Sequence, residues 1–343
     1  MLKYATAEYA TKKAVELLDI DSPTGYTESA AVWVEREFRN LGYETDRTVK
    51  GGVLVDLGGE GDGLLLEAHA DTLGAMVAQI KPDGRLRLTP LGGMQANNAE
   101  CECVRVYTRD GEVLEGTVQL CNASSHVNGD YATTARTFDT VEVVLDEDVK
   151  SAEDARGFGV RVGDIVAFDP RTRLTDSGYI KSRFLDDKLS VGILLGLARH
   201  LREENITPAR HVYVHVTVYE EVGHGGAASV PADVTEAISV DMGCVGEGLS
   251  CTERQVSICA KDSGGPYTYA TVGRLIQAAL ASGADYAVDV YPHYGSDVEA
   301  TLRAGADIAH GLVGAGVYAS HGYERSHMDG VYNTLRLLSK YIQ

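Results

Sequence analysis

The sequence predicts an α/β fold in which a mostly parallel sheet lies between helices and a small all-β, barrel-like domain is inserted into it. The chain has 343 residues, which is long for a single hydrophobic core. Helix and strand patterns alternate in its first and last parts, whereas the middle contains only short strand-like runs separated by turn residues. We therefore expect two domains, one of them discontinuous in sequence.

The first part of the chain opens with two helices. Amphipathic spacing predicts a helix over about residues 3–18, and a second helix from Thr27, a candidate N-cap, to the stop signal Gly42. Two strands follow, at 53–57 and 64–68. The second strand is an unbroken apolar run that ends in polar residues, which is typical of a buried parallel strand.

Turn signals mark the inserted domain, which we place at residues 73–164. Pro82-Asp83-Gly84 and Asp110-Gly111 each separate two strand-like runs and predict β-hairpins. The strand-like runs lie at 76–80, 85–88, 104–108, 112–114, 116–120 and 140–145. Helical periodicity is absent until the 150s, so residues 1–72 and 165–343 are expected to form one α/β domain around the insertion.

Helix and strand alternate again from about residue 165. Four valines at every second position indicate a strand over 212–219. Apolar residues from Met328 onward repeat at helical spacing and predict a terminal amphipathic helix. The other elements expected here are helices at 185–201, 269–281 and 298–304, and strands at 237–240, 286–290 and 307–313.

The composition restricts the classes of function. Asp plus Glu total 50 against 31 Lys plus Arg, and this net charge of −19 argues against nucleic acid and anionic membranes as partners. No apolar stretch reaches the roughly 18 residues that a spanning helix requires. The N-terminus lacks a secretory pattern, so we expect a cytoplasmic protein. Its six cysteines lack CxxC spacing and are expected to be reduced thiols.

Candidate site residues lie just beyond predicted strands or before predicted helices, where open α/β sheets place their sites. His69 and Asp71 follow the apolar strand, and an Asp at this spacing can orient a metal-binding His. Asp186 and Asp187 stand at a helix start, where one carboxylate could bridge two cations. Each pair also has an ordinary explanation, a surface strand end for the first and helix-capping charges for the second.

Glu220 and Glu221 end the valine strand, and two buried glutamates are costly there unless something compensates them. Because adjacent residues cannot share one orientation, one would bind a metal and the other would activate its water. A solvated strand end is the alternative interpretation. Asp241 ends another apolar strand, and His327 stands immediately before the last helix.

Taken together, these residues predict a two-metal hydrolase site. Each metal would have a His and a carboxylate, one carboxylate would be shared, and one Glu would stay free. Nitrogen and oxygen ligands without thiolate favour two divalent ions per chain, Zn²⁺ or Co²⁺ first, with Mn²⁺ also suitable.

The chain resembles the tetrahedral (TET) di-metal aminopeptidases, a family that includes glutamyl, leucyl and deblocking aminopeptidases. The similarity covers essentially the whole chain and includes, in the family's order, HADTLG, FLDDK, YEEVG, SVDMG and YERSH. The run GAMVAQIKPDGRLRLTPLGG is similar to the start of the family's β domain. His126 falls where the family places a His-bearing loop, and Gly295-Ser296-Asp297 resembles its Gly-Thr-Asp turn.

The resemblance implies a set of five metal ligands. Asp186 would bridge both metals. His69 and Asp241 would complete one metal site, and Glu221 and His327 the other. The choice of Asp186 over its neighbour in the motif rests on the resemblance alone.

The resemblance also implies the mechanism and the assembly. Glu220 would be the general base and Asp71 the partner of His69. The inserted β domain would serve self-association, from dimers to tetrahedral dodecamers whose internal chamber admits only short peptides. The implied protein is a cytoplasmic metalloprotease, a hydrolase that removes N-terminal residues from short peptides.

Some alternatives stay open. Thr72 stands where the family usually has an acidic residue, and Glu324-Arg325-Ser326 is an unusual context before the last His. His321 is the alternative to His327 as the terminal ligand. Two other functions are an N-acyl amino acid or peptide deacylase with the same metals, and a non-catalytic metal-binding or assembly protein. The retained glutamate pair argues against the last of these.

Overall fold

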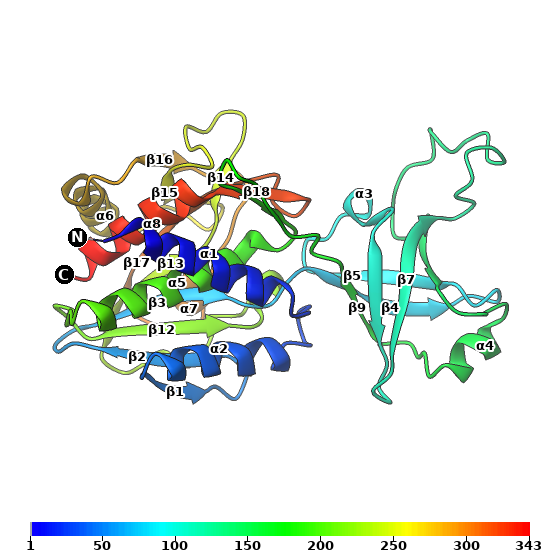
Figure 1. Cartoon of the computed structure of the whole chain (residues 1–343), viewed down its shortest axis with the longest axis horizontal. Helices are drawn as coiled ribbons and strands as arrows, with labels where there is room; N and C mark the ends of the chain where they lie inside the picture. The colour runs from blue at the N-terminus through cyan, green and yellow to red at the C-terminus, as the bar shows by residue number, and fades with distance from the viewer. Residues whose placement is uncertain (1) are drawn as a thin grey trace. The chain divides into compact units, whose positions relative to one another are not determined.

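Two units make up the chain in the computed structural model, which describes residues 2–343 (Figure 1). The α/β unit combines the segment up to Ile20 with Thr27–Asp71 and Arg171–Gln343. The barrel unit consists of Asp21–Tyr26 and Thr72–Pro170. An α/β fold with an inserted all-β domain was the prediction for this chain, and the topology confirms it.

The α/β unit is built on a sheet of twelve strands within the described residues. Its parallel centre consists of β12 (Val212–Thr217), β3 (Gly63–His69), β13 (Val234–Val240) and β17 (Ala309–Tyr318), adjacent in that order. All residues of β3 are buried, as its unbroken apolar run predicts.

Antiparallel strands extend the parallel centre on both sides. On the β12 side these are β2 (Val53–Gly58) and β1 (Glu44–Arg47). On the β17 side the path continues through β18 (Glu324–His327), β11 (Tyr179–Ser182) and β10 (Arg173–Leu174). The remaining strands are β14 (Gly243–Val245) and β15 (Val256–Lys261), which pair with β17, and β16 (Tyr286–Val290), which pairs with β15.

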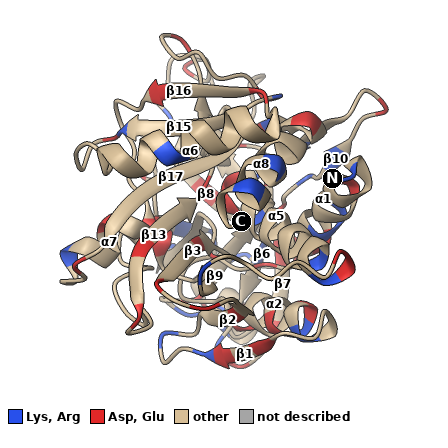
Figure 2. Cartoon of the chain, turned by 90° about the vertical axis from the view of Figure 1, so that its left-hand side faces the viewer, with Lys and Arg blue, Asp and Glu red and all other residues tan. Residues whose placement is uncertain are grey.

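Helices cover both faces of this sheet. In front of it in Figure 1 lie α1 (Tyr4–Leu18), α5 (Leu185–Glu203) and α8 (Met328–Tyr341), whereas α7 (Asp297–Arg303) lies on the far side. α2 (Glu28–Asn40) packs on β1 and β2, and α6 (Tyr269–Ser282) packs on β15 and α8. Nearly every residue of α5 is buried, because this helix lies between α1 and β3. Figure 2 shows acidic and basic residues interspersed over the outer helices and loops.

The barrel unit is a closed ring of six antiparallel strands. Their order is β4 (Gly74–Ile80), β5 (Leu86–Leu91), β8 (Val141–Leu145), β7 (Val113–Leu120), β6 (Cys103–Tyr107) and β9 (Ile165–Phe168). Two short helices, α3 (Ala96–Ala99) and α4 (Ala152–Gly157), accompany them. The expected hairpins β4–β5 and β6–β7 are both present.

The structure moves the limits of the insertion. The α/β domain was expected to resume at residue 165, but β9 pairs with β4 and β6 and closes the barrel. Asp21–Tyr26 also belongs to the barrel unit, since Pro23 forms a bridge with Thr72. Long-range strand pairing, which local sequence does not encode, decides both assignments.

Local patterns also divided one strand and missed the shortest ones. The runs at 112–114 and 116–120 form a single strand, β7, in which Gly116 approaches a neighbouring strand closely: a Cβ there would lie 2.7 Å from the Val144 carbonyl oxygen. The sequence also did not predict β1, β10, β11, β14 and β18, which have two to four residues each, or the six-residue β15. Within the described residues, no helix has the length and apolar content needed to cross a bilayer.

Candidate metal centre

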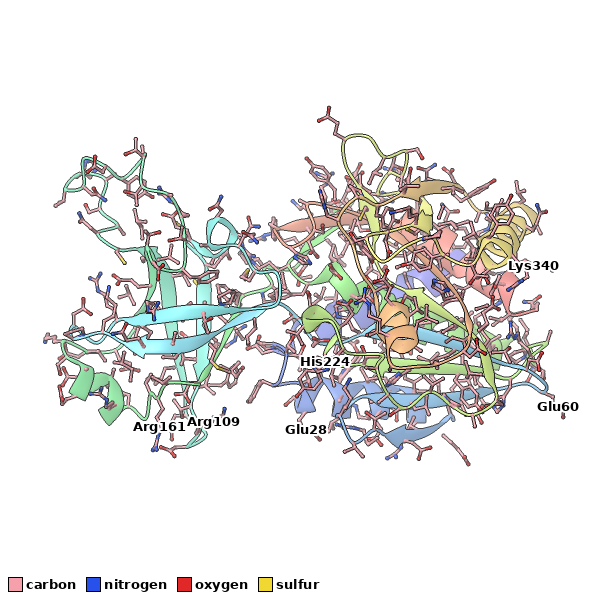
Figure 3. All side chains as sticks on the ribbon, turned by 180° about the vertical axis from the view of Figure 1, so that it is seen from behind. Glu28, Glu60, Arg109, Arg161, His224 and Lys340 are labelled. Atoms are coloured by element: carbon pink, nitrogen blue, oxygen red, sulfur yellow. The ribbon has the colours of Figure 1, made fainter. Side chains whose placement is uncertain are left out.

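The carboxyl ends of three parallel strands bring the candidate residues together. β3 pairs with β12, with His69 opposite Thr217, and with β13 on its other side. His69 is the last residue of β3, the short helix η1 (Glu220–Val222) follows β12, and Asp241 follows β13 directly. Figure 3 labels Glu60, which precedes β3, and His224, which follows η1. The two residues lie at opposite ends of the α/β unit. The cluster therefore occupies the sheet edge where open α/β folds bind ligands.

Asp186 lies between two histidines. Its Oδ1 is 3.2 Å from His69 Nε2, and its Oδ2 is 3.6 Å from His321 Nε2. Asp186 and Asp187 have non-helical backbone angles at the start of α5, and the peptide bond between them is cis. A carboxylate that presents one oxygen to each of two imidazoles has the arrangement required of a bridge between two metal ions.

Two groups of potential ligand atoms share His69. In each group the atoms lie within 4.8 Å of one another; the groups are His69, Asp187 and Asp241, and His69, Asp186 and Glu221. His321 adjoins the second group, because its Nε2 is 3.8 Å from Glu221 Oε2. Asp187 Oδ2 accepts the backbone N–H of His69 at 3.3 Å, so this carboxylate also supports the histidine.

Asp71 supports both His69 and the adjacent glutamates. Its backbone oxygen accepts a hydrogen bond from His69 Nδ1 at 2.9 Å, which leaves Nε2 available as a ligand. Its carboxylate accepts the backbone N–H groups of Glu220 at 3.2 Å and Glu221 at 3.4 Å. The Asp71 carboxylate was expected to be the partner of His69; it lies 3.6 Å from Nδ1, while the backbone oxygen makes the closer contact.

Glu220 and Glu221 project to different parts of the cluster, as their adjacency predicted. Glu220 Oε2 is 3.8 Å from His69 Nε2, whereas Glu221 Oε2 faces His321. Burial, together with repulsion from Asp241, raises the pKa of Glu220 well above its ordinary value. Burial, together with repulsion from Asp186, does the same to the pKa of Glu221.

The other buried carboxylates repel one another in the same way. Burial, followed by the charge of Asp186, raises the pKa of Asp241 to about 7. The pKa of Asp187 is well above its ordinary range because of burial and, next, the charge of Asp241. Burial alone would lower the pKa of His69, but hydrogen bonding to Asp186 and the charge of Glu220 raise it well above its ordinary value.

The side chains present fit a pair of divalent cations. Asp187 Oδ1 and Glu221 Oε1 are buried oxygens without a hydrogen-bond partner among the described residues. Unpartnered buried carboxylate oxygens are costly, and a cation placed among them would satisfy them and relieve the repulsion among the buried carboxylates. The donor atoms are imidazole nitrogens and carboxylate oxygens, which suit Zn²⁺, Co²⁺ and Mn²⁺.

His327, expected as the last ligand, does not join this cluster, and the expectation is corrected. Its Nε2 contacts the Ser177 carbonyl oxygen at 2.7 Å, and its Nδ1 accepts the backbone N–H of Asp329 at 2.9 Å as the N-cap of α8. It also packs against Gly178, where a Cβ would lie 2.7 Å from its Nε2. His321, the alternative, occupies the place beside Asp186.

Two carboxylates that support the cluster were noted in sequence motifs but were given no role there. Asp297 accepts the backbone N–H of Gly226 at 2.6 Å and the hydroxyl of Thr217 at 2.5 Å, and so ties the loop after η1 to β12. Only glycine allows this approach, since a Cβ on Gly226 would lie 2.5 Å from the Asp297 backbone oxygen. Glu324 stands out in the sequence only as an unusual neighbour of the last His; its carboxylate accepts the backbone N–H groups of Asp186 and His321.

His224 follows the glutamate pair in sequence, but its contacts are with Tyr219 and Lys50. Its ring stacks on that of Tyr219, with centroids 4.9 Å apart. Its backbone oxygen accepts a hydrogen bond from Lys50, which also donates to the Gly225 oxygen at 3.1 Å. These contacts fix the loop that follows the glutamates.

Comparison with known proteins gives consistent matches. The family model for M42 glutamyl aminopeptidases matches residues 51–337, a range that contains all the clustered residues. The putative aminopeptidase YhfE of Bacillus subtilis (strain 168) is 41% identical over 330 residues, which cover 96% of this chain and 95% of YhfE. The lysyl aminopeptidase of Pyrococcus furiosus is 29% identical over 195 residues, 56% of this chain and 54% of that protein.

A solved structure shares the fold. The Pyrococcus horikoshii TET1 peptidase, described as assembling into a tetrahedron or a large octahedral shell, superposes with a TM-score of 0.85. The superposition covers 97% of this chain and 99% of that chain at 21% sequence identity. At this identity the likeness establishes a common fold.

Proposed function

Because the chain belongs to the M42 family of glutamyl aminopeptidases, we propose that it removes N-terminal residues from short peptides by hydrolysis at a two-metal centre. Family membership and the named relatives support aminopeptidase activity. We propose in addition that the site holds two metal ions, and we assign their ligands and the general base.

One observation carries the proposal: the Asp186 carboxylate presents one oxygen to His69 and the other to His321. We assign Asp186 as the bridge. The remaining proposed ligands are His69 and Asp241 for one ion, and Glu221 and His321 for the other. Four of these five residues match the expected set, and His321 replaces His327.

Glu220 is the proposed general base. Bound divalent ions would supply a water acidic enough to ionise near neutral pH and would polarise the scissile carbonyl. Glu220 lies beside the proposed ligands without being needed as one, since its Oε2 is 3.8 Å from His69 Nε2. Its carboxylate would accept the proton from the attacking water and deliver it to the leaving amine.

Self-association is also part of the proposal. The TET1 peptidase, which has the same fold, can assemble into a tetrahedron or a large octahedral shell. We propose that this chain forms dimers and then dodecamers, with the barrel unit at the contacts, and that only short peptides reach the sites. A cytoplasmic location remains a prediction from the N-terminal sequence.

A deacylase with the same metals is the second candidate, and substrates with free and blocked amines separate the two. We expect the metal-loaded protein to hydrolyse a free dipeptide and to leave its N-acetylated form intact. Preferential cleavage of the acetylated form would assign a deacylase. Two bound ions without turnover of either substrate would favour the non-catalytic alternative.

A further inference from the structure

We propose that Glu324 is a positioning residue for the metal centre: its single carboxylate holds the backbone at both Asp186 and His321. The inference rests on the proposed function, because these two residues are proposed ligands. Glu324 itself donates no ligand atom to either group of clustered side chains.

The two oxygens of Glu324 are used separately. Oε2 accepts the backbone N–H of Asp186 at 3.1 Å, and Oε1 accepts the backbone N–H of His321 at 2.9 Å. The residue is 2% exposed and is the first residue of β18. One buried side chain therefore links the start of α5 to the loop between β17 and β18.

That loop needs an external restraint. His321 has φ 62° and Ala319 has φ 60°, so two residues other than glycine adopt the left-handed conformation within three positions. Each such residue is energetically disfavoured and persists where its surroundings hold it. The bond from His321 N–H to Glu324 supplies such a hold next to the imidazole that faces Asp186.

Asp71 holds another part of the centre in position, the part formed by His69 and the two adjacent glutamates. Its carboxylate accepts the N–H groups of Glu220 and Glu221, and its backbone oxygen orients His69. Glu324 accepts the backbone N–H of His321 itself, so its loss should act mainly on the ion held by Glu221 and His321, which we call the second ion. The ion held by His69 and Asp241 should be less affected.

The magnitude follows from the behaviour of residues that orient metal ligands. Removing such a partner typically weakens metal binding by about 10- to 100-fold. In Glu324→Gln the amide oxygen can still accept one backbone N–H, but the amide nitrogen then faces the other. We therefore expect the second ion to bind about 10- to 100-fold more weakly. The ion at His69 and Asp241 shares the Asp186 bridge, whose backbone Glu324 also holds, and should be weakened less.

The test is a competition titration of the full-length protein with Zn²⁺ against a chromophoric chelator, repeated with Co²⁺ while its visible spectrum is recorded. Wild type, Glu324→Gln and Glu324→Asp are compared. The control is Glu236→Gln: Glu236 is also 2% exposed and bonded to Arg210, but lies toward the opposite end of the strand that Asp241 follows. The Glu236→Gln variant should have a lower melting temperature but an unchanged affinity for the second ion and an unchanged Co²⁺ spectrum.

The possible outcomes distinguish failure of the positioning role from failure of the proposed function. Selective loss of the second ion and an altered Co²⁺ spectrum in a folded Glu324 variant would support the positioning role. Wild-type affinities and spectrum would overturn it, as would failure of both variants to fold or an equal loss in Glu236→Gln. If the wild-type chain binds fewer than two ions, the proposed function fails and the inference fails with it.

Discussion

At the residue scale, the adjacent glutamates show how neighbouring side chains in one loop can take different roles. Glu220 faces His69 and Glu221 faces His321, while Asp71 holds the backbone N–H groups of both. This division could be predicted, because two carboxylates at a buried strand end need separate compensation.

Replacing Glu220 tests its proposed role as base. Glu220→Gln should keep both ions and lose about 10²- to 10⁴-fold in kcat, because the amide cannot accept the proton. Metal content by mass spectrometry and steady-state hydrolysis of an aminoacyl-arylamide check the two halves of this prediction. A variant near the wild-type rate would remove Glu220 from the mechanism.

The terminal histidine is the proposed ligand at which the structure departs from the expectation drawn from the sequence. A histidine before a helix is a common pattern, and His327 indeed caps α8. His321 lies in a left-handed turn between two strands, where no periodic pattern marks it. Its proposed role as a ligand rests on its contact with Asp186, which is distant in sequence.

Paired substitutions distinguish the two histidines. His321→Ala should retain one tightly bound ion per chain and lose most activity. His327→Ala should retain two ions and lose on the order of 1 kcal/mol of stability, since it removes a helix cap. Metal content and thermal unfolding measured on both variants check this; metal loss in His327→Ala alone would restore the original assignment.

At the element scale, close packing of α1 on α5 supports the strand edge that carries the site. A Cβ on Gly192 would lie 2.5 Å from the Ala10 carbonyl oxygen and 2.8 Å from the Ala14 Cβ. Glycine is therefore retained inside α5 despite its low helix propensity.

Alanine substitutions in two helices test this packing. Gly192→Ala should destabilise the fold by about 1–3 kcal/mol, because overpacking outweighs the gain in helix propensity. Gly273→Ala in α6 is the matched control: no atom lies within 4 Å of the position that its Cβ would take, so it should stabilise by up to about 1 kcal/mol. Chemical denaturation of both variants gives the two values, and a stabilised Gly192→Ala would refute the packing argument.

Elements with strong local patterns could be predicted, and those that depend on distant partners could not. The buried run of β3 and the amphipathic spacing of α8 predicted those elements close to their observed limits. β9 was placed in the wrong unit because its four buried residues fit either a parallel centre or a barrel. Only its pairing with β4 and β6 decides between them.

At the scale of the whole molecule, the discontinuous α/β unit contains every proposed ligand, whereas the barrel unit contains none. The net charge of −19 was expected to exclude nucleic acid, and that expectation stays a prediction. The family was predictable because its motifs are local in sequence and occur in the expected order.

The proposed assembly has a mass that can be measured. Twelve copies of the 36.7 kDa chain would total about 440 kDa. We expect light scattering after size exclusion to show this species, with dimers at lower concentration. A monomer at every concentration would contradict the proposed shell and leave the chemistry of the single site to be judged separately.

The most direct test of the two-metal aminopeptidase is an activity titration after chelation. The stripped protein should be inactive on an aminoacyl-arylamide, and Zn²⁺, Co²⁺ or Mn²⁺ should restore turnover that reaches its maximum at two ions per chain. Full turnover by the stripped protein, or a maximum at one ion per chain, would contradict the account.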